Sequence, residues 1–171
     1  IFNLTDKYQV PGIVLSDLLI SEGRYSVNPE ELDFFPVIDR GETITEGANP
    51  SGEYNRYKFT DTGISPRAVA GLEGYVHVVA TDEHEENSGL ISDEFTNPHK
   101  RRAMVEKRSR KFENIEAQIA PPQVIGAADA DVTLVGWGST FAAMYDAIDL
   151  LAEQGITANF LSVKWLVPLH G

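Results

Sequence analysis

The sequence predicts an α/β protein built around a parallel sheet, and three observations lead to that class. Residues 131–163 have the pattern of a strand, a turn, a helix and a second strand. Residues 12–16 form a short apolar, β-branched run, which is typical of a strand buried on both faces of a parallel sheet. The chain has 171 residues, of which 42% are hydrophobic and 23% charged, so it can bury a core in one ordinary domain or two small ones.

The first 22 residues predict a helix followed by a buried strand. Residues 1–9 have the pattern of an amphipathic helix, and Pro11 breaks that pattern. The strand would cover residues 12–16 and place Asp17 at its carboxyl end, where α/β proteins keep ligand-facing residues. Because the helix pattern is already under way at Ile1, we expect this sequence to be part of a longer protein.

Residues 21–62 predict an extended, turn-rich linker rather than regular structure. Glycine and proline recur throughout this stretch, and the apolar residues show little periodicity. A linker this long is expected to be functional or to lie against a neighbour. The apolar segment 34–38, Phe-Phe-Pro-Val-Ile, is the expected point of docking on a domain surface.

The middle of the chain predicts a strand, an acidic loop and a basic helix. Residues 74–80 alternate as a strand does, and Asp82-Glu-His-Glu-Glu86 opens the acidic loop over 81–99. Pro98 marks the start of a helix over about residues 100–119, which Pro121 and Pro122 end. Its apolar positions are expected to face protein and its basic side to be exposed, the apolar positions being Met104, Phe112, Ile115 and Ile119.

The last part of the chain predicts a right-handed strand–helix–strand unit. Residues 131–135 form the first strand and residues 158–163 the second, and Gly155 ends the helix between them. The turn Gly136-Trp-Gly-Ser139 joins strand to helix, with Ser139 or Thr140 as the expected helix cap. The helix residues expected to be buried are Phe141, Met144, Ile148 and Leu151.

Composition excludes several classes of function. The net charge of −12 argues against nucleic-acid or membrane-surface binding. Seven of the 14 basic residues lie between Lys100 and Lys111, so the rest of the chain is more acidic still. With no cysteine, this chain alone cannot form a disulfide or bind an iron–sulfur cluster, and a cytoplasmic setting is expected. No apolar run is long enough to cross a membrane.

Two motifs admit both a functional and a structural interpretation. Gly136-Trp-Gly-Ser139 could hold a phosphate on backbone N–H groups, but close packing of helix on strand is the favoured explanation. The Glu83-His-Glu-Glu86 stretch has no second histidine at ligand spacing, so a solvated acidic loop is favoured over a metal site.

Five residues remain as candidates for contact with a ligand or subunit. His84 could make a polar contact near a shared active site. Arg67 could bind a carboxylate or phosphate, or form an ordinary salt bridge. Three arginines of the basic helix are expected to meet an acidic surface of a partner or the acidic loop before them, namely Arg101, Arg102 and Arg108.

Four segments in order along the chain resemble one enzyme family. They are Thr62-Gly-Ile-Ser-Pro-Arg-Ala68, Asp82-Glu-His-Glu-Glu86, Arg102-Ala-Met-Val-Glu-Lys-Arg-Ser-Arg-Lys111 and Leu134-Val-Gly-Trp-Gly-Ser-Thr140. Together they resemble the α subunit of 2-oxoacid:ferredoxin oxidoreductases, most closely the 2-oxoglutarate (KorA-type) branch. The resemblance assigns residues 1–22 to the end of a pyrimidine-binding domain, 23–120 to the linker, acidic loop and basic helix, and 121–171 to the start of a transketolase C-terminal-like domain.

The resemblance implies a thiamine diphosphate enzyme that oxidatively decarboxylates a 2-oxoacid to an acyl-CoA and passes electrons to ferredoxin. It implies Mg with the thiamine cofactor in the complete enzyme, an iron–sulfur cluster on a partner subunit, and a β subunit as partner. No cofactor is expected on this chain alone, and no catalytic residue can be transferred to it, since the family's substrate and cofactor-activating segments would precede Ile1. A non-catalytic α/β binding or assembly domain is the alternative, as is a transketolase-like subunit of another thiamine enzyme.

Overall fold

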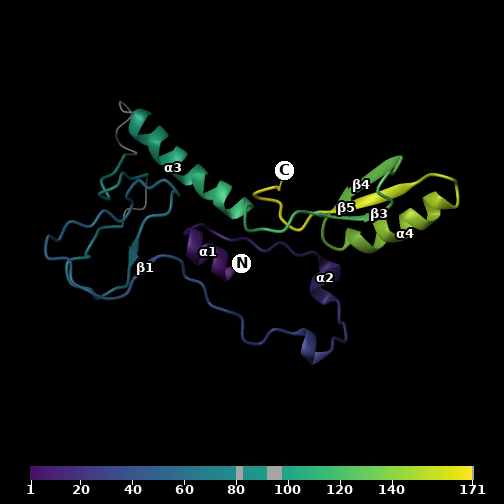
Figure 1. The fold of residues 1–171 in the computed structure, drawn as a ribbon, viewed down its shortest axis with the longest axis horizontal. Helices are drawn as coiled ribbons and strands as arrows, with labels where there is room; N and C mark the ends of the chain where they lie inside the picture. Colours follow the sequence, from purple (N-terminus) through teal and green to yellow (C-terminus); the bar gives the residue numbers. More distant parts are fainter. Residues whose placement is uncertain (80–82, 92–97, 171) are drawn as a thin grey trace. The chain divides into compact units, whose positions relative to one another are not determined.

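The computed structural model describes residues 1–79, 83–91 and 98–170, and these form two compact units (Figure 1). One unit combines Ile1–Gly12 with Val37–Ala117, and the other combines Ile13–Pro36 with Gln118–Gly171. Each unit is thus assembled from two separate stretches of the chain. The chain is α/β with a parallel strand pair, as the sequence predicts.

The second unit is built on a three-stranded sheet in the order β3-β5-β4. β4 (Val132–Gly136) runs parallel to β5 (Ala158–Ser162), and β3 (Gln123–Gly126) runs antiparallel to β5. Between β4 and β5 the chain forms α4 (Thr140–Ala152), which lies along the sheet in Figure 1. The predicted strand–helix–parallel strand over residues 131–163 is confirmed, whereas β3 was not foreseen.

The core of this unit is small and centres on β5. Phe160 is fully buried, and the Phe141 ring packs edge-on against it with the ring centroids 5.0 Å apart. Full burial of one face of α4 was expected, and that expectation is wrong. Phe141 is 43% exposed, and Met144, Ile148 and Leu151 are half-buried. A sheet of three short strands is too narrow to cover a helix of this length.

The segment before the sheet also differs from its prediction. Residues 12–16 form no strand, and Ile13 and Val14 are 79% and 74% exposed. Their composition suits a buried strand, but none of the described strands pairs with them. Two short helical segments follow, α2 (Leu18–Glu22) and the 3₁₀ turn η1 (Pro29–Glu31).

The first unit contains two helices and one short parallel strand pair. The predicted helices are confirmed as α1 (Phe2–Tyr8) and α3 (Pro98–Glu116). β1 (Thr43–Ile44) pairs with β2 (Arg67–Ala68). The buried Tyr8 joins the two helices, because its Oη donates a hydrogen bond of 3.2 Å to the carbonyl of Asn114.

The turn-rich character predicted for residues 21–62 is confirmed. The apolar side chains of the 34–38 segment are exposed in this chain, Phe35 by 93%, while the carbonyl of Val37 accepts a hydrogen bond of 2.7 Å from Asn3 Nδ2. Residues 75–79 form no strand, although Tyr75 and His77 both pack edge-on against the Tyr54 ring. Ala80, Asp82 and Asn97, which belong to the predicted strand and acidic loop, lie outside the described residues.

Candidate functional site

In the first unit, the 60–68 turn is held by hydrogen bonds at several of its residues. The Tyr54 hydroxyl donates to the carbonyl of Pro66 and accepts from the N–H of Ala68, both at 3.0 Å. The Thr60 hydroxyl donates to the carbonyl of Ile64 at 2.9 Å. These contacts fix the backbone on both sides of Arg67.

Ser65 connects this turn to the basic helix and to α1. Its buried hydroxyl donates to the carbonyl of Lys58 at 2.9 Å and accepts from Nζ of Lys107 at 2.6 Å. Its carbonyl accepts from the Gln9 side chain at 2.6 Å. Three segments distant in sequence therefore meet at one serine.

Two lysines of α3 point inward, whereas Arg101, Arg102 and Arg108 lie on the exposed basic side that the sequence predicts. Lys107 and Lys111 are only 4% and 9% exposed. Besides Ser65, Lys107 donates to the carbonyl of Tyr57 at 2.7 Å, while Lys111 donates to the carbonyl of Gln9 at 2.9 Å. Both lysines therefore connect α3 by hydrogen bonds to the segments packed against it.

The burial of these amines changes their proton affinity. Loss of solvation, reinforced by the nearby charge of Lys111, lowers the pKa of Lys107 to about 8. Loss of solvation likewise lowers the pKa of Lys111 from its ordinary value. Among the described residues neither lysine forms an ion pair, so neutral oxygens are their acceptors.

Arg67, a sequence candidate for anion binding, is held in an internal ion pair. Its guanidinium donates to Asp6 at 2.9 Å, and Arg40 reaches the other oxygen of the same carboxylate at 2.8 Å. The bond from Arg67 lowers the pKa of Asp6 from its ordinary value. Two guanidinium groups thus share one carboxylate, which leaves this cluster of three side chains with a net positive charge.

The described part of the acidic segment folds back onto α3. Glu83 forms a two-pronged ion pair with Arg108, and that contact lowers the pKa of the Glu83 carboxyl. Glu85 pairs with Lys100 at 3.3 Å. The ring of His84 lies against that of Tyr57, with the centroids 3.6 Å apart. The acidic segment and the basic helix therefore neutralise part of each other's charge within one unit.

The three arginines singled out on the basic helix have different surroundings. Arg108 is occupied by Glu83, whereas Arg102 forms an i,i+4 pair with Glu106 in which its side chain stays 79% exposed. Arg101 is exposed on the same helix. Arg101 and Arg102 are thus the two of the three that a partner could reach without breaking an internal contact between loops.

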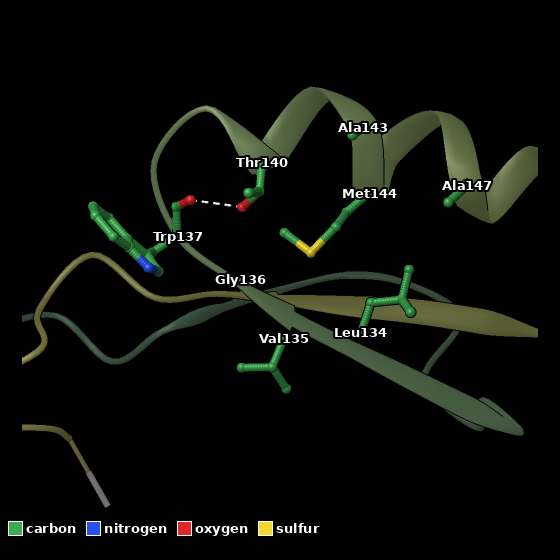
Figure 2. Close-up of a pocket in the computed structure, with 8 residues that line it drawn as sticks. All are labelled: Leu134, Val135, Gly136, Trp137, Thr140, Ala143, Met144 and Ala147. Atoms are coloured by element: carbon green, nitrogen blue, oxygen red, sulfur yellow. Dashed lines mark hydrogen bonds between the residues drawn. The ribbon is translucent and has the colours of Figure 1, made fainter. Parts of the chain in front are cut away.

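In the second unit, the glycine turn between β4 and α4 is shaped by close packing. A Cβ atom on Gly136 would come within 2.5 Å of Met144 Cε and 2.7 Å of Thr140 Oγ1. The structure therefore supports the packing explanation of this motif. The expected side-chain cap by Ser139 or Thr140 is absent, because the Thr140 hydroxyl donates to the carbonyl of Trp137 (Figure 2).

Asp17 supplies the acceptor that the start of α4 lacks. Its Oδ2 accepts from the N–H of Ser139 at 2.9 Å, and its Oδ1 accepts from the N–H of Ile20 at 3.0 Å. These backbone donors, Ile20 first, hold the pKa of Asp17 below its ordinary value. The carboxylate of Asp17 therefore occupies the backbone N–H of Ser139, in the turn that was considered as a phosphate site from the sequence.

An open apolar groove of about 520 Å³ lies between α4 and β4 (Figure 2). Figure 2 shows Met144 reaching down from the helix toward the strand. The groove is lined mainly by small and apolar residues and by no titratable side chain. It is therefore better suited to apolar packing than to acid–base catalysis. Its lining residues are Leu134, Val135, Gly136, Trp137, Thr140, Ala143, Met144 and Ala147.

Sequence reasoning missed the two buried lysines, although the spacing of α3 held a signal for them. Met104, Lys107, Lys111 and Ile115 recur at intervals of three and four residues and form one stripe, and all four are buried. Phe112, assigned to that face, is instead 41% exposed. A lysine that falls on an apolar stripe is a candidate for an internal hydrogen-bond donor.

This chain is similar to subunits of one kind of enzyme. The chain is 34% identical over 99% of its length to 2-oxoacid:ferredoxin oxidoreductase 2, subunit alpha, of Aeropyrum pernix. It is 32% identical over 97% of its length to the corresponding subunit alpha of Saccharolobus solfataricus. The 2-oxoglutarate synthase subunit KorA of Methanothermobacter marburgensis is 25% identical over 98% of the chain. No family model matches the sequence.

A solved structure shares the fold. A 2-oxoglutarate:ferredoxin oxidoreductase from Magnetococcus marinus, with 2-oxoglutarate, coenzyme A and succinyl-CoA bound, matches with a TM-score of 0.75 and 28% identity over 98% of this chain. The chain spans 28% of that protein, 26% of the Aeropyrum and Saccharolobus subunits and 42% of the Methanothermobacter subunit. The resemblance drawn from the sequence is confirmed, and it concerns one segment of these longer subunits.

Proposed function

We propose that this chain is a segment of the α subunit of a 2-oxoacid:ferredoxin oxidoreductase, with 2-oxoglutarate as the preferred substrate. The observation that carries the proposal is collinear similarity, in sequence and fold, over nearly the whole chain to such subunits. The complete enzyme converts a 2-oxoacid and CoA to an acyl-CoA and carbon dioxide and transfers two electrons to ferredoxin.

The cofactors belong to other parts of the enzyme. Thiamine diphosphate supplies carbanion stabilisation when bound, and an iron–sulfur cluster carries the electrons onward. The sequence has no cysteine, the residue that holds iron–sulfur clusters in proteins. We therefore assign thiamine diphosphate and Mg to the complete enzyme and the cluster to a partner subunit.

We assign to this chain a structural role within the subunit and a role in its contact with the β subunit. α3 and its two buried lysines hold the 60–68 turn and the 83–91 segment in place. We propose that Arg67 and His84 stabilise loops facing the substrate or a neighbouring subunit, and that Arg101 and Arg102 meet an acidic surface of the β subunit. None of the helices in the described part has the length and apolarity to cross a bilayer. We place the enzyme in the cytoplasm, where CoA and ferredoxin occur.

Reconstitution tests the proposal. The complete α subunit that contains this chain, purified with its β subunit and loaded with cofactors, should reduce ferredoxin only when a 2-oxoacid and CoA are both present. Succinyl-CoA formed from 2-oxoglutarate, identified by mass, would establish the substrate. The isolated chain should show no turnover. A loaded complex that is inert toward 2-oxoglutarate, pyruvate and branched 2-oxoacids would refute the assignment.

A further inference from the structure

The buried side of α3 carries two lysines that form no ion pair with an acid among the described residues. Lys107 and Lys111 are almost fully buried, and their acceptors are carbonyl groups and one hydroxyl. Buried charges are weakly screened, so the two lysines set up a positive potential at pH values below their lowered pKa.

One arginine adds to that potential. Arg56 is half-buried, and its guanidinium lies 5.5 Å from the centroid of the Tyr57 ring. Within the described residues Arg56 has no hydrogen bond and no ion pair. Its charge lowers the pKa of both lysines, which places all three cations within electrostatic reach of one another.

Ion-paired acids are absent around these cations within the described residues, although the chain has 26 acidic residues against 14 basic ones. One acid whose charge reaches Lys107 is Glu86. One carboxylate oxygen of Glu86 is already engaged by the N–H of Phe59 at 2.6 Å. A single carboxylate cannot balance this group of cations.

We infer that Arg56 binds an anionic group of the phosphate class, with Lys107 and Lys111 supplying the surrounding positive potential. The planar guanidinium fork matches the geometry of a phosphate and remains partly accessible, whereas the lysines are too buried to touch a ligand directly. A doubly charged oxyanion offsets more of the excess charge than one carboxylate does. The inference does not depend on the proposed reaction.

Anion titration of the full chain tests this site. Thermal unfolding is followed as sodium pyrophosphate is added at constant ionic strength, with sodium chloride and sodium succinate as reference anions. Pyrophosphate should raise the unfolding midpoint in a saturable way, because a ligand that binds only the folded state stabilises it. In Arg56→Gln the half-saturating concentration should rise by about tenfold or more, since a charge-assisted hydrogen bond is lost.

Two further variants keep the result unambiguous. Arg24→Gln removes an exposed arginine from the other unit and should respond as the wild type does. Arg56→Lys keeps the charge without the fork and should fall between wild type and Arg56→Gln, which separates lost binding from a failure to fold. An unsaturable pyrophosphate response, or equal responses of wild type and Arg56→Gln, would overturn the inference. Tighter binding of succinate or of a glutamate-rich peptide would assign the site to an acidic protein surface instead.

Discussion

Single residues decide the local geometry of both units, and Lys107 is the clearest case. Its amine has two acceptors, the carbonyl of Tyr57 and the hydroxyl of Ser65, which match the two N–H bonds of a neutral amine. Burial lowers its pKa to about 8, so the folded chain favours the uncharged form in mild alkali. A residue that looks like surface charge in the sequence is an internal hydrogen-bond donor in the fold.

The first prediction concerns the pH dependence of stability at Lys107. Its folded-state pKa of about 8 lies below the ordinary 10.5, so between these values the unfolded chain binds more protons. The free energy of unfolding should therefore rise with pH in that window. Denaturant titrations at several pH values should show this rise in the difference between wild type and Lys107→Met. A difference that is flat from pH 7 to 10 would mean that Lys107 is not desolvated.

The second prediction concerns Gly136, where no side chain fits without a shift of Met144. Gly136→Ala should destabilise the second unit by about 1–3 kcal/mol, as overpacking does. Met144→Ala in the same chain should recover part of that loss, because it removes the Met144 atoms that a new Cβ would meet and leaves only the contact with Thr140 Oγ1. Denaturant melts of the two single variants and the double variant measure this coupling. Strictly additive effects would show that the two residues do not compete for space.

At the scale of elements, the sequence pattern predicted the positions of those helices and strands that have a clear local periodicity. α1, α3, α4 and the parallel β4–β5 pair all lie where the pattern placed them. Burial was predicted less well, because it depends on which neighbour covers an element. The 12–16 run has the composition of a buried strand, but none of the described strands lies beside it. The apolar face of α4 is only partly buried, because a sheet of three short strands is too narrow to cover it.

The candidate site was predictable to a similar degree. The segments 62–68 and 83–86 and the basic helix were identified, but not their mutual contacts, because pairs such as Arg67 with Asp6 and Arg108 with Glu83 join residues far apart in sequence. The capping of α4 by Asp17 is likewise set by tertiary structure, since 122 residues separate the carboxylate from Ser139. Nothing in the turn itself indicates that partner.

The third prediction contrasts two packing positions of the second unit. Phe160→Ala should cost about 3–5 kcal/mol, because Phe160 is fully buried at the centre of the sheet. Ile148→Ala on the half-buried face of α4 should cost about 1 kcal/mol, in proportion to the smaller area removed from water. Denaturant unfolding of both variants gives the ratio. Equal costs would mean that α4 is covered more fully than the structure describes.

The fourth prediction contrasts two ion pairs of α3. Glu83 and Arg108 should show a coupling free energy of about 1 kcal/mol in a double-mutant cycle, while Arg102 and Glu106, which are more exposed, should show about 0.3–0.5 kcal/mol. Because the pKa of Glu83 is lowered, its contribution is present above the ordinary carboxyl pKa and lost as pH falls through the folded value. Equal couplings for the two pairs, or no loss in acid, would contradict this assignment.

At the scale of the whole molecule, many more large apolar side chains are exposed than are buried in the cores of the two units. Ile13, Leu18 and Phe35 are all more than three-quarters exposed, and each belongs to a longer apolar stretch. The relatives that this chain matches are about two to four times its length. We therefore regard these stretches as surfaces that are covered in the complete subunit or in its complex.

The fifth prediction concerns assembly of that complex. Arg101→Glu with Arg102→Glu should weaken co-purification of the complete α subunit with its β subunit, because reversed charges oppose the acidic surface that we assign to the partner. The melting temperature of the α subunit alone should change little, since both side chains are exposed. Arg108→Glu is the contrasting variant, and it should lower the stability of the α subunit because it removes the ion pair with Glu83. Undiminished assembly of the double variant would exclude these two arginines from the interface.

Hydrogen exchange at residues 13–20 tests most directly whether this chain is part of a larger enzyme subunit. The amides of this segment are compared between the isolated chain and the complete α–β complex under one set of conditions. We expect fast exchange in the isolated chain, where Ile13 and Val14 are exposed, and strong protection in the complex, where the segment is covered. Equally fast exchange in both would show that the segment stays exposed in the complex and would favour an autonomous binding domain.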